Sequence, residues 1–332
     1  MNRLTITSLL SLVLVLLFVA CSPNETKQIT LAEVTRSVFY TPQYVALEKG
    51  YFKEEGLEVD LQTSWGGDKT MTALLSDHAD IALVGSETSV YVHAQNASDT
   101  IINFAQLTQT DGTFLVSKEA IDHFTWEDVR DEVFLGQRKG GMPQMVGEYV
   151  LKQNGIDPTK DLTELIQHID FANIPAAFAS GDAKFVQLFE PTASVFEQEG
   201  KGYVVASFGE ESGLIPYTVF MTKASMIEND RETIEKFTRA IYKAQKWVEA
   251  ANSEEIAEVV EPYFEDTTLE ILTASIERYK AQESFALNPI LTESAWDNLL
   301  NIMDEAGELP GESPYEELVN TDIAKDVMSQ LD

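Results

Sequence analysis

Several aromatic residues stand directly beside predicted turns, where they could hold a small ligand. Phe39 and Tyr40 precede a predicted helix start, and Trp65 precedes Gly66 in a second turn. Flat apolar walls suit small-molecule pockets because they stack on planar groups. The three side chains are therefore candidates for a stacking platform, and the alternative is that each belongs to the hydrophobic core.

Polar residues occupy the matching positions at two predicted helix starts. Gln43 lies in the first turn of the helix that follows Tyr40, where backbone N–H groups are free. Ser86 and Glu87 open the helix that follows Gly85. Ser86 is expected to cap that helix, and Glu87 favours its dipole. In the functional interpretation, the Ser86 hydroxyl bonds a ligand and Glu87 faces a cationic one.

The stretch "GQRKGGMPQ" places basic residues before a helix start. Arg138 precedes Gly140 and Gly141, a pattern that can bind an anion at a helix N-terminus. No G-K-[ST] follows, so the spacing is not that of a nucleotide-binding P-loop. The alternative is a flexible loop with solvated basic side chains.

The stretch "FEP" sets an acid between an aromatic residue and another helix start. Glu190 either caps that helix or accepts hydrogen bonds from a ligand, with Phe189 and Tyr217 as further candidate walls. Glu87 and Glu190 in one pocket would repel a sulfonate, whereas Arg138 would attract one. We favour a ligand with nitrogen-bound hydrogens, such as a nitrogen heterocycle.

The elements that must position these residues alternate along the chain. Five strand–turn–helix events predict an α/β protein with mostly parallel sheets flanked by helices. Ligands bind at the carboxyl ends of the strands in such folds. One helix is predicted from Thr41 to Gly56, and a helical tail begins at Asp230. In that tail a 3-4-3-4 spacing predicts one buried face, formed by Ile234, Phe237, Ile241, Ala244 and Val248.

Composition limits the class of partner. The chain has 332 residues, enough for two compact domains, and 55 acidic against 23 basic residues give a net charge of −32. Phosphate contacts need basic patches, so a nucleic-acid partner is excluded. The four histidines lack metal-motif spacing, and no second cysteine is available for a zinc site. We therefore expect no metal, no cofactor and no catalytic residue.

The N-terminus indicates export. Residues 1–20 hold an apolar run too short to span a bilayer, as in a signal peptide, and the run ends in "LFVAC". Cys21 is the only cysteine, and it resembles the lipidated cysteine of bacterial lipoproteins. Phe18 departs from the leucine usual three positions earlier. The expectation is a diacylglycerol anchor on Cys21 with residues 21–27 as a tether, and the alternative is an ordinary secretory signal.

The segments "TPQYVALEKGYFKEEGLEVDL" and "GGDKTMTALLSDHADIALVG" resemble the solute-binding proteins of bacterial ABC importers. The nearer branch takes up aliphatic sulfonates, nitrate, taurine or the pyrimidine precursor of thiamine. The resemblance implies a two-lobed clamshell of the periplasmic-binding-protein type (type II) with a helical C-terminal tail. Lobe one would hold residues 28–111 and 216–332, and lobe two residues 112–215, with the solute clamped between them.

The resemblance also implies partners and a location. A monomer, lipid-anchored at the cell membrane and facing outside the cytoplasm, would deliver its solute to an ABC permease and its ATPase. A nitrogen heterocycle such as a thiamine pyrimidine precursor is the favoured solute, and a sulfonate, taurine or nitrate is the alternative. Two other classes share the fold. One is a pyrimidine-biosynthetic enzyme, disfavoured because its cysteine-rich motif is missing, and the other is a sensory ectodomain.

Overall fold

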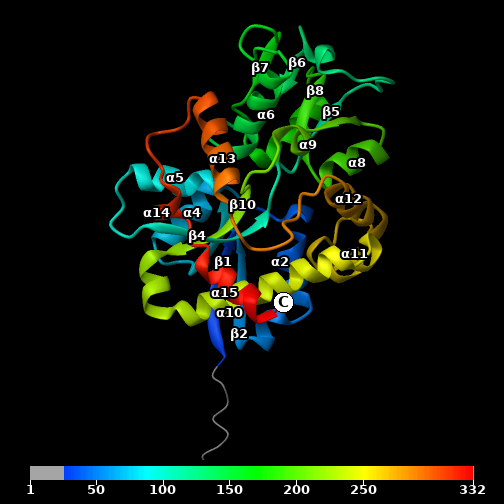
Figure 1. Ribbon diagram of the computed structural model, residues 1–332. Helices are drawn as coiled ribbons and strands as arrows, with labels where there is room; N and C mark the ends of the chain where they lie inside the picture. Colours follow the sequence, from blue (N-terminus) through cyan, green and yellow to red (C-terminus); the bar gives the residue numbers. More distant parts are fainter. Residues whose placement is uncertain (1–25, 332) are drawn as a thin grey trace, which may run out of the picture.

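The computed structural model describes residues 26–331, which form two five-stranded sheets surrounded by helices (Figure 1). The predicted signal peptide, Cys21 and most of the predicted tether lie outside the described residues. Buried apolar side chains from Ile29 to Val327 build the cores of the fold. A chain that begins at Ser22 therefore contains every residue of those cores.

The first sheet has the strand order β2-β1-β3-β10-β4. Its strands are β1 (Lys27–Glu33), β2 (Leu57–Thr63), β3 (Ile81–Gly85), β4 (Ile101–Thr108) and β10 (Thr218–Lys223). β1 pairs in parallel with β2 and β3, whereas β10 runs antiparallel to both β3 and β4. The central strand β3 is almost wholly buried, as expected for a strand covered on both faces.

The second sheet repeats this plan with the order β7-β6-β8-β5-β9. Its strands are β5 (Thr113–Ser117), β6 (Val133–Leu135), β7 (Glu164–Ile166), β8 (Phe185–Phe189) and β9 (Tyr203–Ser207). β6 is parallel to β7 and β8, whereas β5 is antiparallel to β8 and β9. We call the halves built on the two sheets the first and second lobes.

One strand in each sheet is reversed, and in both sheets it is the strand that enters from the other lobe. The chain leaves the first sheet after β4 and begins the second with β5, then returns after α9 to begin β10. An entering strand starts where the other strands end, so its direction is opposite. The prediction of mostly parallel sheets is confirmed with this qualification, and the exact lobe boundaries stay a prediction.

The helices of the first lobe follow its strands closely in sequence. They are η1 (Val38–Tyr40), α2 (Thr41–Glu48), α3 (Tyr51–Glu54), α4 (Gly67–Leu75) and α5 (Glu87–Ala94). The single helix predicted from Thr41 to Gly56 is wrong, because Gly50 has a φ of 74° and separates α2 from α3. The left-handed region that breaks the helix costs glycine little.

The second lobe has shorter helices with one exception, α6. Its helices are η2 (Trp126–Val129), α6 (Met142–Gln153), η3 (Phe171–Asn173), α7 (Ile174–Ser180), α8 (Thr192–Gln198) and α9 (Phe208–Ser212). The first turn of α6 follows Gly141, and Pro143 occupies one of its first positions, where the missing N–H has no intrahelical partner to lose.

The C-terminal part is helical, as predicted. It consists of α10 (Ala224–Ala250), α11 (Ser253–Val260), η4 (Glu261–Tyr263), α12 (Leu269–Ala281), α13 (Glu293–Glu305), α14 (Tyr315–Leu318) and α15 (Asp322–Leu331). The five residues of the predicted stripe on α10 are all buried. Asp230 interrupts α10 with non-helical backbone angles, and its carboxylate accepts hydrogen bonds from Thr233.

Two of these C-terminal helices reach the second lobe. α12 packs on α8, and α13 packs on α6 (Figure 1). Asn298 on α13 donates hydrogen bonds to the carbonyl oxygens of Ser212 and Leu214, at the return from the second lobe. The C-terminal helices therefore pack against both lobes. None of the described helices is long and apolar enough to cross a membrane.

Candidate ligand-binding site between the lobes

Two adjacent parallel strands bring the predicted polar residues of the first lobe to one edge. β1 pairs with β3 from Leu31 to Glu33, and both strands end at the same side of the sheet. The helix that follows β1 carries Gln43 in its first turn, and the helix that follows β3 carries Glu87. The sheet topology thus collects residues that lie more than 40 positions apart, at the edge where α/β folds bind ligands.

A buried carboxylate at the end of β1 fixes the orientation of Gln43. Glu33 accepts hydrogen bonds from Gln43 Nε2 at 2.8 Å, the Tyr44 hydroxyl at 2.9 Å and the Thr63 hydroxyl at 2.8 Å, and it pairs with Arg36 at 3.1 Å. Because an ionised carboxylate only accepts, the amide nitrogen of Gln43 must point towards it. Gln43 Oε1 is left buried, with no hydrogen-bond partner from residues 26–331.

Ser86 does not cap α5, and that expectation is wrong. Its backbone is already helical, with φ of −61° and ψ of −26°, whereas a capping side chain needs an extended backbone. Its N–H donates to the Tyr217 carbonyl at 3.2 Å. The Ser86 hydroxyl is completely buried and has no hydrogen-bond partner among the described residues.

Glu87 reaches from the first lobe to the second. The side chain is 5% exposed, and its Oε1 accepts a hydrogen bond from the Met142 N–H, in the first turn of α6, at 3.3 Å. Its Oε2 is buried and has no hydrogen-bond partner in the part of the chain that the structure describes. The carboxylate lies over Gly85, where an added Cβ would stand 2.1 Å from Oε2. Glycine at position 85 therefore makes room for this conformation.

Burial dominates the electrostatics of Glu87. It raises the pKa of the carboxyl from 4.5 to about 7, while the N–H groups of Glu87 and Met142 oppose the rise. Burying a carboxylate costs several kcal/mol, whereas a hydrogen bond to a charged group returns about 1.5–3 kcal/mol. A helix N-terminus adds about 0.3–1 kcal/mol. The contacts seen here are too weak to compensate the charge fully.

Aromatic side chains from both lobes meet next to these polar groups. The Phe39 ring lies 6.2 Å from Tyr40, 5.9 Å from Phe189, 5.4 Å from Tyr217 and 5.1 Å from Tyr279, measured between ring centroids. Phe39, Tyr40, Tyr217 and Tyr279 belong to the first lobe, whereas Phe189 ends β8 of the second lobe. The structure therefore brings together four of the five predicted aromatic walls in one cluster.

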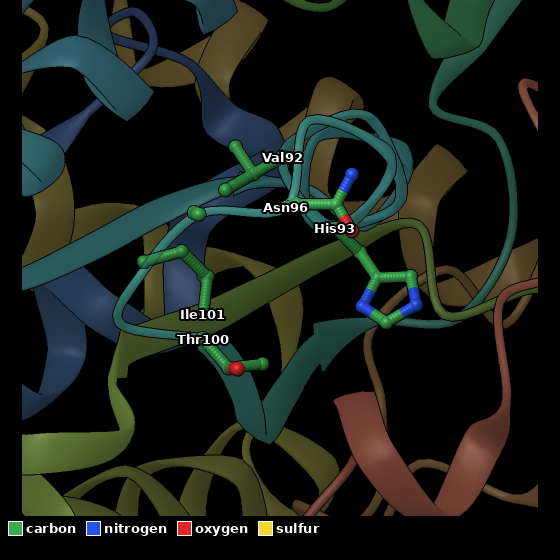
Figure 2. A pocket seen from close by; sticks show the side chains of 6 residues that line it. Val92, His93, Asn96, Thr100 and Ile101 are labelled. Atoms are coloured by element: carbon green, nitrogen blue, oxygen red, sulfur yellow. The ribbon is translucent and has the colours of Figure 1, made fainter.

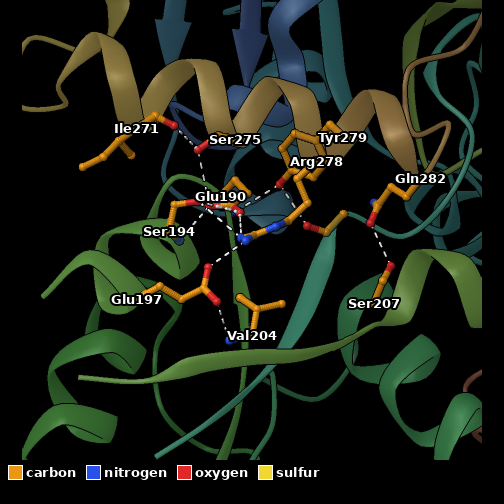
Figure 3. Close-up of polar contacts among 11 residues, drawn as sticks. Glu190, Ser194, Glu197, Val204, Ser207, Ile271, Ser275, Arg278, Tyr279 and Gln282 are labelled. Atoms are coloured by element: carbon orange, nitrogen blue, oxygen red, sulfur yellow. Dashed lines mark hydrogen bonds and ion pairs between the residues drawn. The ribbon is translucent and has the colours of Figure 1, made fainter. Parts of the chain in front are cut away.

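Glu190 has a different environment from the one predicted for a ligand-binding acid. Its carboxylate accepts from the N–H of Ser194 at 2.9 Å and from the Ser194 hydroxyl at 3.0 Å, so it satisfies an N–H of the first turn of α8, although Pro191 is the N-cap residue. It also pairs with Arg278 of α12, which bonds Glu197 at 2.6 Å as well (Figure 3). The charge of Glu190 is thus compensated inside the protein.

The same face of α12 holds the chain where it first crosses between the lobes. The Tyr279 hydroxyl donates to the Gly112 carbonyl at 2.9 Å and accepts from the Glu190 N–H at 3.0 Å. Gln282 Nε2 donates to the Asp111 carbonyl at 3.0 Å, and its Oε1 accepts from Ser207 at 2.7 Å (Figure 3). These contacts define a network between α12 and the crossing segment that is separate from the polar groups around Glu87.

The other predicted residues lie at an exposed rim. Trp65 is 58% exposed and has a φ of 58°, a left-handed conformation that is unusual for a bulky residue. Arg138 is 53% exposed and pairs at 3.6 Å with Asp68 of the first lobe and with Asp170. Three glycines flank these side chains, namely Gly66 before α4 and Gly140 and Gly141 before α6.

A shallow surface pocket lies away from this site. It is lined by Val92, His93, Asn96, Ala97, Thr100 and Ile101, at the end of α5 and the start of β4 (Figure 2). These residues are at the opposite end of α5 from Glu87. Within residues 26–331, no group of three or more His, Cys, Asp or Glu side chains is arranged to hold a metal ion.

Sequence reasoning missed four residues, one at the site and three in the network between α12 and the crossing segment. Glu33 carried a usable signal, because it is a single acid at the carboxyl end of an apolar strand, as Glu87 is just after β3. Asp111, Arg278 and Tyr279 carried none. Their roles depend on α12 packing against the crossing segment more than 160 residues earlier, a contact that no local pattern encodes.

The architecture defines the class of protein. Two mixed sheets flanked by helices, with the chain crossing twice between them, form the two-lobed periplasmic-binding-protein-like fold predicted from the sequence. Solved structures agree. The ligand-binding component of an ABC-type import system from Staphylococcus aureus has a TM-score of 0.71 at 15% identity, covering 91% of this chain and 99% of that chain. The alkanesulfonate-binding protein SsuA from Xanthomonas axonopodis pv. citri has a TM-score of 0.70 at 14% identity, with 90% and 99% covered.

Sequence comparison gives the family. The model of the NMT1-like family matches residues 22–261. The Bacillus subtilis (strain 168) protein named "Putative binding protein YtlA" is 58% identical over 321 residues, which are 96% of each chain. The chain belongs to the NMT1-like family. The predicted resemblance to solute-binding proteins is therefore confirmed at the level of family and fold.

Proposed function

We propose that this protein is the extracytoplasmic solute-binding component of an ABC importer. The lobes open to admit a small nitrogen compound, close on it, and present it to a permease whose ATPase partner consumes ATP. The protein itself carries out no chemical step. The support comes from the fold, which it shares with a ligand-binding component of an ABC-type import system, and from the name of its 58% identical relative.

The observation that carries the choice of ligand is the set of buried acceptors without donors. Gln43 Oε1 and Glu87 Oε2 lie at the edge where the lobes meet, and neither has a hydrogen-bond partner within residues 26–331. Buried polar groups are normally hydrogen-bonded, because leaving one unpaired costs about 1–3 kcal/mol. A ligand that carries N–H groups supplies the missing donors, and the aromatic cluster around Phe39 provides its walls.

The charges near the site point the same way. Arg36 is paired with Glu33, Arg278 with Glu190, and Arg138 with two exposed aspartates. A sulfonate or nitrate would therefore meet arginines that are already paired, together with an uncompensated Glu87. We propose a nitrogen heterocycle, such as an aminopyrimidine related to thiamine, as the solute.

A sulfonate, taurine or nitrate is the second candidate. The fold match to an alkanesulfonate-binding protein and the exposed Arg138 beside the α6 N-terminus favour it. In this case the anion would replace Glu87 at the Met142 N–H, since that donor is now occupied by the carboxylate. The two candidates therefore predict opposite roles for Glu87.

We also propose that Cys21 carries a diacylglycerol anchor that holds the protein, as a monomer, on the outer side of the cytoplasmic membrane. Two acyl chains give stable attachment, whereas one gives only marginal binding. Mass spectrometry of the protein extracted from membranes tests the anchor. The expected product begins at a lipidated Cys21, and a product that begins at another residue contradicts it.

A thermal-shift screen of the soluble chain that starts at Ser22 tests the ligand. The panel contains aminopyrimidines, thiamine, taurine, alkanesulfonates and nitrate. Binding to the folded state alone adds about 2.7 kcal/mol of stability at a ligand concentration of 100 times Kd. A shift with aminopyrimidines only supports the proposal. A shift with sulfonates or nitrate only overturns the choice of ligand and leaves the class of protein in place.

A further inference from the structure

Among the described residues, Glu87 is the only one in the first turn of α5 whose side chain forms a hydrogen bond with the second lobe. One oxygen bonds the first turn of α6, and the other faces no donor. A second contact between the same helices, from the Tyr91 hydroxyl to Met145 Sδ at 3.8 Å, holds them together. Closure of the lobes therefore seals an unpartnered carboxylate oxygen between α5 and α6.

The groups that face Glu87 do not neutralise it. Tyr40 comes from η1, Tyr91 from α5 itself, and Tyr217 from the segment before β10. Burial raises the pKa of all three phenols, so they stay neutral. Across the interface, α6 presents a backbone N–H and the apolar Met145. The nearby Arg138 is exposed and paired elsewhere.

We propose that Glu87 acts as a charge gate on lobe closure. Its ionised carboxylate opposes closure of the empty protein, and a ligand N–H or ammonium group that donates to Oε2 removes this opposition. The inference rests on the proposed function in one respect, namely that the ligand binds between the lobes. It deepens that function by giving Glu87 two roles. Glu87 selects ligands that donate a hydrogen bond, and it keeps the lobes from closing when no ligand is bound.

The gate has a definite pH dependence. With α5 against α6 as in this structure, which we take as the closed form, burial raises the pKa of Glu87 to about 7. Water would return it towards 4.5 when the lobes part. The closed form thus binds more protons than the open form between these values. Proton linkage then favours closure at low pH, and that support is lost as the pH rises from 4.5 to 7.

Small-angle X-ray scattering of the ligand-free chain from Ser22 to Asp332 tests the gate. The wild type is expected to have a smaller radius of gyration at pH 5 than at pH 8.5. Glu87→Gln removes the charge and keeps an acceptor for Met142, so it is expected to have the small radius at both pH values. An unchanged radius in the wild type, or an unchanged pH response in Glu87→Gln, overturns the gate.

Two control variants assign the response to Glu87. Asp111 is also buried at a crossing, and burial raises its carboxyl pKa to about 6. Asp111→Asn is expected to keep the wild-type response. Glu148→Gln, further along α6, removes a carboxylate that accepts hydrogen bonds from Gln144 and Gln167 of the same lobe, and it is also expected to keep the response. A response lost in Asp111→Asn and kept in Glu87→Gln overturns the assignment.

A second arm at pH 8.5 adds one probe at a time, 4-aminopyrimidine or taurine at millimolar concentration. The aminopyrimidine is expected to reduce the wild-type radius to its pH 5 value, and taurine is expected to leave it unchanged. A smaller radius with taurine and an unchanged radius with the aminopyrimidine contradict the proposal that Glu87 selects ligands that donate a hydrogen bond. The ligand-free arm needs no bound solute, so failure of the gate and failure of the proposed function are separate results.

Discussion

Two buried glutamates stand at corresponding positions of the two lobes, and they have opposite environments. Glu190 follows β8, and Glu87 follows β3, each at the start of a helix. Glu190 has Arg278, Ser194 and a capped helix turn around it, whereas Glu87 has one long hydrogen bond and one bare oxygen. A buried charge that the protein satisfies itself is structural, and one that it leaves unsatisfied is available to a ligand.

This difference also separates two sides of the interface. The Glu190 side is tied by α12 to the crossing segment through Tyr279 and Gln282. The Glu87 side meets the second lobe through weaker contacts at 3.3 and 3.8 Å. We infer that the α12 side is the hinge and that the Glu87 side is the part that opens.

The largest expected effect on the free energy of unfolding comes from removing the counter-charge of Glu190. Arg278→Ala leaves Glu190 buried without a counter-charge, and such losses cost about 3–5 kcal/mol. Chemical denaturation at pH 7.5 measures the free energy of unfolding. Arg231→Ala is the matched control, because Arg231 forms exposed ion pairs with Glu235 and Asp326 that are worth about 0–1 kcal/mol. Equal losses in both variants would contradict the structural role of Glu190.

Neutralising Glu87 is expected to change the free energy of unfolding in the opposite direction, towards greater stability. Burial raises the pKa of Glu87 to about 7, so its ionised form destabilises the closed protein above that pH. Glu87→Gln is expected to raise the free energy of unfolding by about 1–3 kcal/mol at pH 8. The upper end of this range applies when the lobes of the wild type stay closed. If they open, water rehydrates the carboxylate and the destabilisation is smaller.

The sign of the pH dependence is the sharper test of that variant. At pH 4 both the wild type and Glu87→Gln carry a neutral side chain, so their stabilities are expected to agree. Denaturation curves from pH 4 to 8 should then diverge as the pH rises, with the wild type losing stability. Destabilisation by Glu87→Gln at pH 8 would show that the carboxylate is satisfied after all.

A steric change at the crossing is expected to have an intermediate effect. A Cβ on Gly112 would stand 2.7 Å from the Phe39 ring, which is buried among other aromatic rings and cannot move freely. Gly112→Ala should destabilise the protein by about 1–3 kcal/mol, as overpacking does. Gly311→Ala is the control, because nothing lies within 4 Å of its added Cβ. Its thermal denaturation is expected to match the wild type.

The smallest effect on stability is expected at the rim. Trp65 is 58% exposed, so Trp65→Ala should change the free energy of unfolding by no more than about 0.5 kcal/mol. If its ring covers the ligand, the affinity for the compound found in the thermal-shift screen should fall at least about tenfold, which is 1.4 kcal/mol. Calorimetric titration measures it, and unchanged affinity would remove Trp65 from the site.

The sequence predicted the fold well because its signals are local. Alternating strands and helices, the spacing on α10 and the turns at Gly66 and Gly85 each depend on neighbouring residues. The helix break at Gly50 was missed, because Tyr44, Leu47 and Tyr51 keep a helical spacing of apolar side chains across it. The reversed strands β5 and β10 were missed as well, since strand direction depends on which lobe the chain enters from.

The candidate site was predictable only in part. Glu87 and Gln43 could be named because they follow strands that meet at one edge of the sheet. The different environments of Glu87 and Glu190 could not be predicted, because they depend on Arg278, which lies 88 residues after Glu190 in the chain. In a protein with 55 acidic residues, composition alone cannot separate a compensated carboxylate from an uncompensated one.

A crystal structure of the soluble chain with the compound that gives the largest thermal shift tests the central claim most directly. We expect a ligand N–H within hydrogen-bonding distance of Glu87 Oε2 and of Gln43 Oε1, with Glu190 still bonded to Arg278. A ligand anion bound at the Met142 N–H, with Glu87 displaced from α6, would contradict the account.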